Sequence, residues 1–177
     1  IGAHYDAAGE FPAADDNASG VAGLLELGRT ISEFKLPFKV LLAGYTLEEP
    51  PYFGTDKMGS AVHAKSLADA HEDVRLMISI EMIGYFSNES GSQHYPSDIL
   101  ATFLPTRGNF IGIIGPFTTS LAALDIKSAF VRSVPLPAIS ANLPPLATGG
   151  GLSDHRNYWA EGFDAVMISD TAFFRNT

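Results

Sequence analysis

Acidic residues, together with one histidine, follow the apolar segments of this sequence that have the length of β-strands. In α/β proteins the carboxyl ends of the strands meet at one edge of the sheet, where ligands bind. Like charges gathered beside apolar strands cost free energy unless a cation or a proton offsets them, so the set predicts a divalent metal site. Its members are His4, Asp6, Asp15, Asp16, Glu48, Glu49 and Glu81.

The mixture of imidazole and carboxylate favours zinc over magnesium or calcium, which prefer ligand sets made of oxygen alone. His4 and Asp6 are two residues apart and therefore share one face of a strand, so Asp6 can take the ring N–H of His4 and direct its other nitrogen to a metal. Successive side chains of an extended segment diverge. Of Glu48 and Glu49, we therefore expect one to bind metal and the other to act as the general base of a hydrolytic reaction.

Each of these residues also has a structural explanation when it is considered alone. Asp16 or Asn17 can cap the helix that begins there, and Glu81 can be a solvated strand end. Residues 48–49 can form a polar turn, and His4 can be a core histidine. The metal site is favoured because these separate explanations must all hold at one edge of one sheet.

Strand and helix patterns alternate along the whole chain. Apolar runs predict strands over residues 1–4, 38–45, 74–80, 110–114, 136–140 and 165–169. Helical patterns fall near residues 17–34, 57–70, 120–131 and 154–161. In the first helix, one face is formed by Val21, Leu24, Leu25, Gly28 and Ile31. The alternation predicts an α/β three-layer sandwich, in which a mostly parallel mixed sheet has helices on both faces.

Two long loops are expected between these elements, over residues 87–107 and 141–153. The second is rich in Gly and Pro, and we expect it to be mobile and near the site. The length of 177 residues fits one domain with a sizeable core.

Composition excludes several classes of function. Eleven basic and 20 acidic residues give a formal net charge of −9, which argues against nucleic acid or anionic membranes as partners. No apolar run reaches the roughly 18 residues of a membrane-spanning helix. Cysteine is absent, which excludes disulfides, thiolate zinc sites and cysteine nucleophiles. The first residues do not form a signal peptide, and an exported or periplasmic location is compatible with the sequence.

The ordered set of motifs resembles the co-catalytic zinc aminopeptidase family, whose relatives include glutamate carboxypeptidase and glutaminyl cyclase. The matching segments span nearly the whole chain and are GAHYD (2–6), ADDNASG (14–20), EE (48–49), EMIG (81–84) and SDH (153–155). The resemblance implies that Asp16 bridges two zinc ions and is often followed by a cis peptide bond. It implies that His4 and Glu81 complete one metal site, that Glu49 binds the other metal, and that Glu48 is the general base.

The resemblance also implies that Asp6 orients His4, and that Asp154 and His155 lie beside the substrate pocket without binding metal. Two departures from the family follow. Glu81 stands where the family commonly has Asp, and no histidine follows the last strand before Thr177, although the second zinc normally receives one from that region. Both ends are therefore expected to be cut, with residues 1–177 forming a single catalytic core from a longer domain. The remaining histidines, His63, His71 and His94, are expected on the surface.

The expected function is that of a zinc-dependent exopeptidase, an aminopeptidase acting on peptides with a free amino terminus. The acidic rim would attract that cationic terminus. Two alternatives are an acyltransferase similar to glutaminyl cyclase and a non-catalytic binding domain on the same scaffold. The sequence leaves open the side-chain preference, the oligomeric state, and the choice between aminopeptidase, dipeptidase and carboxypeptidase.

Overall fold

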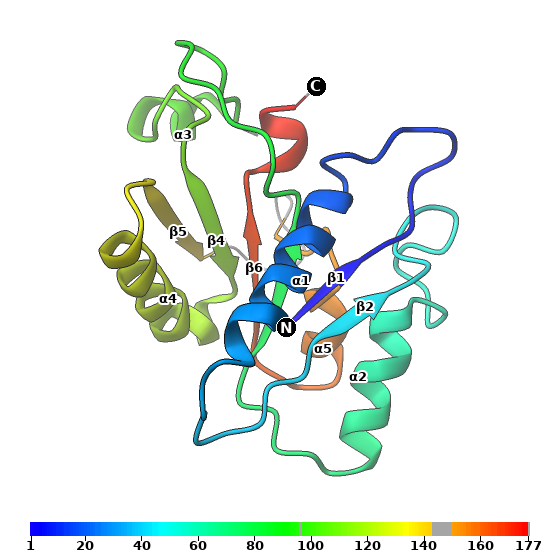
Figure 1. Ribbon diagram of the computed structural model, residues 1–177. Coiled ribbons are helices and arrows are strands. Elements are labelled where there is room, and N and C mark those ends of the chain that lie inside the picture. The colour runs from blue at the N-terminus through cyan, green and yellow to red at the C-terminus, as the bar shows by residue number, and fades with distance from the viewer. Residues whose placement is uncertain (96, 143–149, 177) are drawn as a thin grey trace.

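A six-stranded mixed sheet forms the centre of the computed structural model, which describes residues 1–95, 97–142 and 150–176 (Figure 1). The strand order is β2-β1-β3-β6-β4-β5. The first four strands in this order are mutually parallel, and β4 and β5 run in the opposite direction, since β4 pairs with β6 antiparallel. The strands are β1 (Gly2–His4), β2 (Ala43–Tyr45), β3 (Met77–Glu81), β4 (Ile111–Gly115), β5 (Ala138–Asn142) and β6 (Ala165–Ser169).

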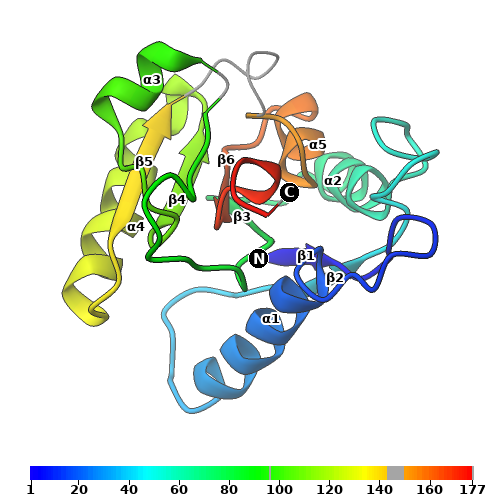
Figure 2. The same ribbon diagram turned by 90° about the horizontal axis from the view of Figure 1, so that it is seen from above.

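Helices cover both faces of the sheet, as Figure 2 shows. On one face, Leu24 of α1 packs with Ala3 and Ile80, and Ala123 of α4 packs with Ile113 of β4. On the other face, α2 and α5 pack against Tyr45, Met77 and Ala165. The helices are α1 (Ala18–Ile31), α2 (Gly59–Asp69), α3 (Asp98–Phe103), α4 (Ser120–Ser133) and α5 (His155–Ala160), with short 3-10 turns η1 (Phe117–Thr119) and η2 (Ala172–Phe174). The predicted α/β fold and mostly parallel mixed sheet are confirmed.

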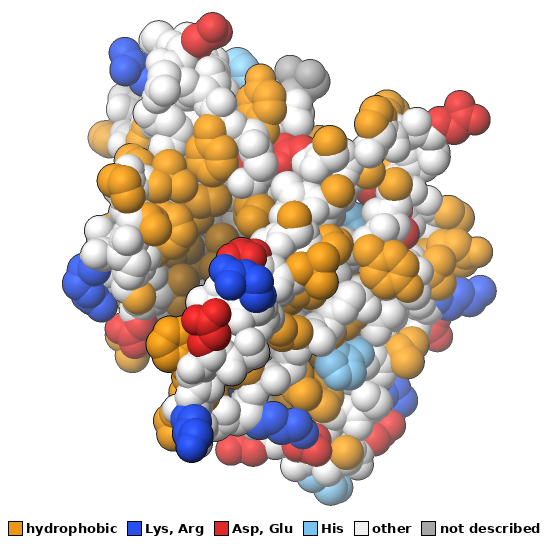
Figure 3. Space-filling model, in the orientation of Figure 1, with side chains coloured by type: hydrophobic (Ala, Val, Ile, Leu, Met, Phe, Trp, Pro, Cys, Tyr) orange, Lys and Arg blue, Asp and Glu red, His pale blue; other side chains and the backbone are white. Residues whose placement is uncertain are grey.

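Alternation along β3 decides which side chains reach the site. Ile78 and Ile80 point to the face covered by α1 and α4, where hydrophobic side chains gather between these two helices (Figure 3). Ser79 and Glu81 point to the opposite face, where Ser153 contacts both of them. The period of two in a strand therefore separates the apolar core from the polar cluster.

Four expectations about the elements are wrong. The strand expected over residues 38–45 is formed only over Ala43–Tyr45, which pair with Gly2–His4 of β1. Leu25 is 70% exposed, although it was placed on the buried face of α1. The predicted loop over 87–107 contains α3, and β5 extends to Asn142, while residues 143–149 of the second loop lie outside the described residues. None of the described helices combines the length and apolar character that crossing a bilayer requires.

Candidate metal centre

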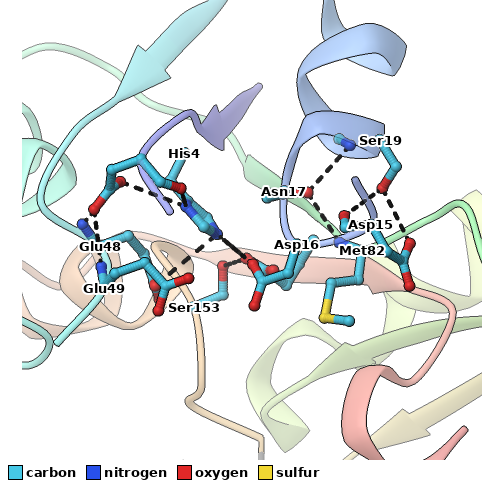
Figure 4. A network of polar contacts seen from close by, with 12 residues as sticks. His4, Asp15, Asp16, Asn17, Ser19, Glu48, Glu49, Met82 and Ser153 are labelled. Atoms are coloured by element: carbon cyan, nitrogen blue, oxygen red, sulfur yellow. Dashed lines mark hydrogen bonds and ion pairs between the residues drawn. The ribbon is translucent and has the colours of Figure 1, made fainter. Parts of the chain in front are cut away.

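The imidazole of His4 lies at the centre of the polar cluster (Figure 4). His4 is the last residue of β1 and is fully buried. Its Nε2 atom is 3.1 Å from Asp16 Oδ1, 3.4 Å from Glu81 Oε2 and 3.9 Å from Glu48 Oε2. The structure thus brings together side chains from β1, from the turn before α1, from the loop after β2 and from the end of β3.

Three buried atoms of this cluster converge without hydrogen-bond partners. His4, Asp16 and Glu49 each offer one possible ligand atom, and these atoms lie within 4.8 Å of one another. The buried atoms of these residues that lack partners are His4 Nε2, Asp16 Oδ1 and Glu49 Oε1. None of the three has a well-aligned hydrogen bond to any described residue, in spite of the short distance between His4 and Asp16. Buried polar atoms are normally paired, because an unpaired one costs free energy. One imidazole nitrogen and two carboxylate oxygens are a donor set that fits zinc.

The electrostatics of the cluster favour a positive charge. Burial of His4 lowers its pKa, but the nearby carboxylates of Asp16, Glu81 and Glu48 outweigh burial and raise it to about 12. Burial is the main cause that raises the pKa of Glu48 to about 9, and the charges of Glu81, Asp154 and Glu49 add to it, against the opposing charge of His4. The site therefore carries an excess of negative charge, which a bound cation would offset.

Glu81 is held in a different way from the other carboxylates. It is buried, its Oε2 atom accepts a hydrogen bond of 2.7 Å from Ser153 Oγ, and Ser153 Oγ is 2.9 Å from Ser79 Oγ. We expected Glu81 to complete the group of His4 and Asp16. Its Oε2 atom lies 3.4 Å from His4 Nε2, which is compatible with that expectation. Glu49 also has a carboxylate oxygen within 4.8 Å of possible ligand atoms of His4 and Asp16.

Asp6 connects the histidine to the two glutamates. Its two carboxylate oxygens accept hydrogen bonds from the backbone N–H groups of Glu48, at 3.2 Å, and of Glu49, at 3.1 Å. The ring of His4 makes its hydrogen bond through Nδ1 to the backbone oxygen of Asp6, with the carboxylate 3.5 Å away. Asp6 thus contacts the ring of His4 through its backbone oxygen, while its carboxylate also binds two backbone amides. The expectation that Asp6 orients His4 stays a prediction.

The turn that carries Asp16 is fixed on both sides. The Asp16–Asn17 peptide bond is cis, as the resemblance implies. Asp15 accepts hydrogen bonds from Gly84 N, at 2.9 Å, and from the side chain of Asn176. Asp15 thus holds the backbone, and is not part of the cluster around His4. Asn17 caps α1 by accepting from Gly20 N.

Asp154 and His155 lie at the start of α5 and are not among the residues that line the cavity beside the cluster. Both are fully buried. Burial, the largest cause, raises the pKa of Asp154 to about 7, and Ser60 is close to its carboxylate without a well-aligned hydrogen bond. His155 Nε2 is 2.7 Å from the backbone oxygen of Gly150, and its ring packs edge-on against Trp159. Burial lowers the pKa of His155 to about 4.

The other histidines lie outside the cluster. His71 and His94 are exposed, as expected. His63 is half-buried, and its Nδ1 atom is 2.9 Å from the hydroxyl of Tyr158 and 3.2 Å from that of Tyr45. His63 is thus partly exposed and is not part of the metal cluster, as expected.

An apolar cavity of about 340 Å³ opens from the cluster. Its polar end contains Asp16, Glu48, Glu49 and Glu81. Its floor is the sheet face over β4, β5 and β6, where the register sets Ile139, Gly112 and Ser169 in one row and Ala141, Ile114 and Met167 in the next. Its side walls include Phe53, Leu104 and Phe110. The cavity therefore joins a charged end to a hydrophobic surface.

Sequence reasoning missed residues that hold the walls of this site. Ser153 was seen only as part of the SDH motif, although its place one residue before a conspicuous Asp-His pair was a usable signal. No feature of the sequence indicated that Arg175 would support the site. It is buried, donates to the backbone oxygens of Tyr85 and Phe110 and to Gln93, each at 3.0 Å, and stacks on the ring of Phe110.

The comparisons with known proteins agree with this geometry. A model of peptidase family M28 matches residues 1–176. The chain is 46% identical over 184 residues to "Uncharacterized protein YfbL" of Escherichia coli, a match that covers 99% of this chain and 56% of that protein. It is 27% identical over 205 residues to leucine aminopeptidase 2 of Trichophyton rubrum, covering 100% of this chain and 39% of that protein. The chain therefore spans about half the length of the curated relatives it matches, or less.

Solved structures share the fold. LapB from Legionella pneumophila superimposes with a TM-score of 0.69 at 22% identity, over 99% of this chain and 42% of that one. BSAP, a zinc aminopeptidase from Bacillus subtilis, gives a TM-score of 0.69 at 18% identity, over 100% of this chain and 37% of that one.

Proposed function

Because this chain belongs to peptidase family M28, we propose that it is the catalytic core of a zinc-dependent aminopeptidase, which removes N-terminal residues from peptides. The observation that carries the proposal is the group of His4, Asp16 and Glu49. Their possible ligand atoms lie within 4.8 Å of one another, and three of their atoms are buried without hydrogen-bond partners among the described residues. The relatives named leucine aminopeptidase and the neighbour named as a zinc aminopeptidase support the same activity.

His4, Asp16, Glu49 and Glu81 would hold the metal. We propose two ions in the complete enzyme, with Asp16 shared between them. His4 and Glu81 would hold one, and Glu49 would contribute to the other. The position of Asp16, close to His4 and within the same group as Glu49, supports this sharing. When bound, zinc would polarise the scissile carbonyl and lower the pKa of a water molecule.

Glu48 is the proposed general base. It would take a proton from the attacking water and return it to the leaving amine as the peptide bond breaks. Three features support this role: Glu48 is buried, it faces the cavity, and its carboxylate is 3.9 Å from His4 Nε2. Asp6 would keep Glu48 and Glu49 in place by binding both of their backbone N–H groups.

The substrate we propose is a peptide with a free amino terminus and an apolar first side chain. The carboxylates at the polar end of the cavity would attract the ammonium group. Apolar walls from Phe53, Leu104, Ile139 and Met167 would bind the side chain through burial of hydrophobic surface. The net charge of −9 supports the absence of nucleic-acid partners.

Peptide hydrolysis before and after zinc removal tests the proposal. The chain is treated with a chelator, dialysed, and assayed with and without added zinc on Leu-Gly-Gly and on its N-acetylated form. We expect zinc to restore release of leucine from the free peptide alone. Cyclisation of N-terminal glutamine without hydrolysis would instead indicate the acyltransferase. Zinc binding without any turnover would indicate a binding domain, and either result would overturn the proposal.

A further inference from the structure

The side chain of Asn17 joins the beginning of α1 to β3. Asn17 is 1% exposed, and its amide makes three hydrogen bonds. Its Oδ1 atom accepts from Gly20 N at 3.1 Å and from Met82 N at 3.0 Å, and its Nδ2 atom donates to Ile80 O at 2.9 Å. Figure 4 shows Asn17 between the first turn of α1 and Met82.

Two of these partners flank Glu81 directly. Ile80 precedes Glu81 and Met82 follows it, so the Asn17 amide binds the backbone on both sides of that carboxylate. Asn17 itself follows Asp16, whose Oδ1 atom lies 3.1 Å from the ring of His4. One side chain therefore fixes the backbone of two proposed ligands, Asp16 and Glu81, relative to each other.

Helix capping does not account for this arrangement. A cap needs one side-chain oxygen that accepts from the first turn, and Ser, Asp and Asn serve almost equally well. The hydrogen bonds to Ile80 O and Met82 N lie outside the helix and require a donor and an acceptor in one planar group, which among these residues only Asn provides.

The surroundings of Asn17 are shaped for close contact with β3. A Cβ atom on Gly20 would overlap Asn17 Oδ1 and would lie 2.8 Å from Ile80 O. Met82 has a φ of 47°, which is unusual for a residue other than glycine. Its N–H is bound by Asn17, and its backbone oxygen accepts from Asp170 N at 2.7 Å. The left-handed turn immediately after Glu81 is thus held from both sides.

We infer that Asn17 is a positioning residue of the metal centre, which sets the spacing between Asp16 and Glu81 without touching metal or substrate. The inference rests on the proposed function for its metal. Loss of the Asn17 amide should therefore lower zinc affinity more than it lowers the free energy of unfolding. Residues that position metal ligands typically contribute 10- to 100-fold in metal affinity.

Two substitutions separate positioning from capping in the full chain. Asn17→Ser retains a capping oxygen, but its side chain is too short to bind both Ile80 and Met82. Asn17→Asp also retains the cap, but replaces the donor to Ile80 O by a second acceptor. Leu25→Gly is the matched control, because it weakens the same helix at an exposed position, by about 1 kcal/mol, away from β3.

The measurements are zinc affinity by competition with a chelator, thermal stability without metal, and hydrogen exchange of the Met82 amide. We expect Asn17→Ser to lower zinc affinity about 10- to 100-fold and to speed exchange at Met82, with Asn17→Asp at least as severe. Leu25→Gly should lower stability and leave zinc affinity unchanged. Normal zinc affinity in Asn17→Ser, or an equal loss in Leu25→Gly, would overturn the inference, as would an unmodified chain that binds no zinc. A chain that binds zinc but cleaves no peptide would refute the proposed function alone.

Discussion

The hydroxyl group of Ser153 lies 2.7 Å from Glu81 Oε2, with both side chains buried. Ser153 immediately precedes the Asp154 cap of α5, whereas Glu81 ends β3, so this hydrogen bond connects a helix start to the sheet edge. Ser79, on the same face of β3, contacts the Ser153 hydroxyl at 2.9 Å. The orientation of Glu81 therefore depends on α5 as well as on its own strand.

Ser153→Ala should lower zinc affinity by about 10- to 100-fold, because Glu81 would lose the donor that fixes one of its oxygens. Ser133→Ala is the control, since Ser133 is an exposed helical serine that bonds only a backbone oxygen. Chelator competition measures both variants. Equal affinities in the two variants would show that Ser153 does not orient Glu81.

Glu48→Gln should lower the rate of peptide hydrolysis by roughly 10²–10⁴, because glutamine cannot take a proton from water. Zinc content should stay unchanged, since Glu48 is not a proposed ligand. Zinc analysis and turnover are measured on the same sample, with the exposed Glu89→Gln as control. A variant that hydrolyses peptides at the unmodified rate would end the role of Glu48 as base.

Asp6→Asn should reduce activity or zinc affinity about 10- to 100-fold and destabilise the fold by about 1–3 kcal/mol. Asparagine offers one oxygen to two backbone N–H groups, and its NH₂ group would face one of them as a second donor. Asp56→Asn, an exposed change in the following loop, should have no effect. Urea unfolding and amide exchange of Glu48 and Glu49 measure the result. Unchanged exchange at both amides would contradict it.

Stability should fall in acid because of His155. Its pKa is lowered to about 4 in the folded protein by burial, whereas an unfolded histidine titrates near 6.5. Between these values the unfolded chain binds the proton more readily, so the contribution is complete above about pH 6.5 and is lost as pH falls toward 4, on the order of 3 kcal/mol in all.

Urea unfolding of the unmodified chain and of His155→Gln, from pH 7.5 to 4, measures this contribution. Asp154, whose pKa is raised to about 7, acts in the opposite sense in the same range, so the difference between the two chains isolates His155. The glutamine variant should lose less stability on acidification. Parallel curves for the two chains would refute the assignment.

Local sequence patterns predicted the strands and helices well where hydrophobic side chains recur with a regular period. Residues 165–169 read as a buried strand and form β6 with those bounds, and the helix expected from Ser120 begins there as α4. The pattern failed for residues 38–42, because an apolar run does not by itself identify a pairing partner, and Phe38, Leu41 and Leu42 are exposed.

The cluster around His4 was predictable because the carboxyl ends of parallel strands converge. The contacts that distinguish the individual carboxylates of the cluster were not predictable. The orientation of Glu81 depends on a hydrogen bond from Ser153, which is 72 positions from Glu81 in the chain. The carboxylate of Asp6 likewise binds amides 42 and 43 positions away. Spacing within a strand carries no information about such contacts.

The reversal of strand direction between β6 and β4 has an evolutionary consequence. The charged residues come from the ends of β1, β2 and β3, whereas the floor of the cavity comes from alternate positions of β4, β5 and β6, among them Ile139, Ala141 and Met167. On the proposed function, mutations at those floor positions can change which peptides are accepted while the ligands stay untouched. Related proteins with this sheet can therefore differ in substrate specificity and keep the same catalytic reaction.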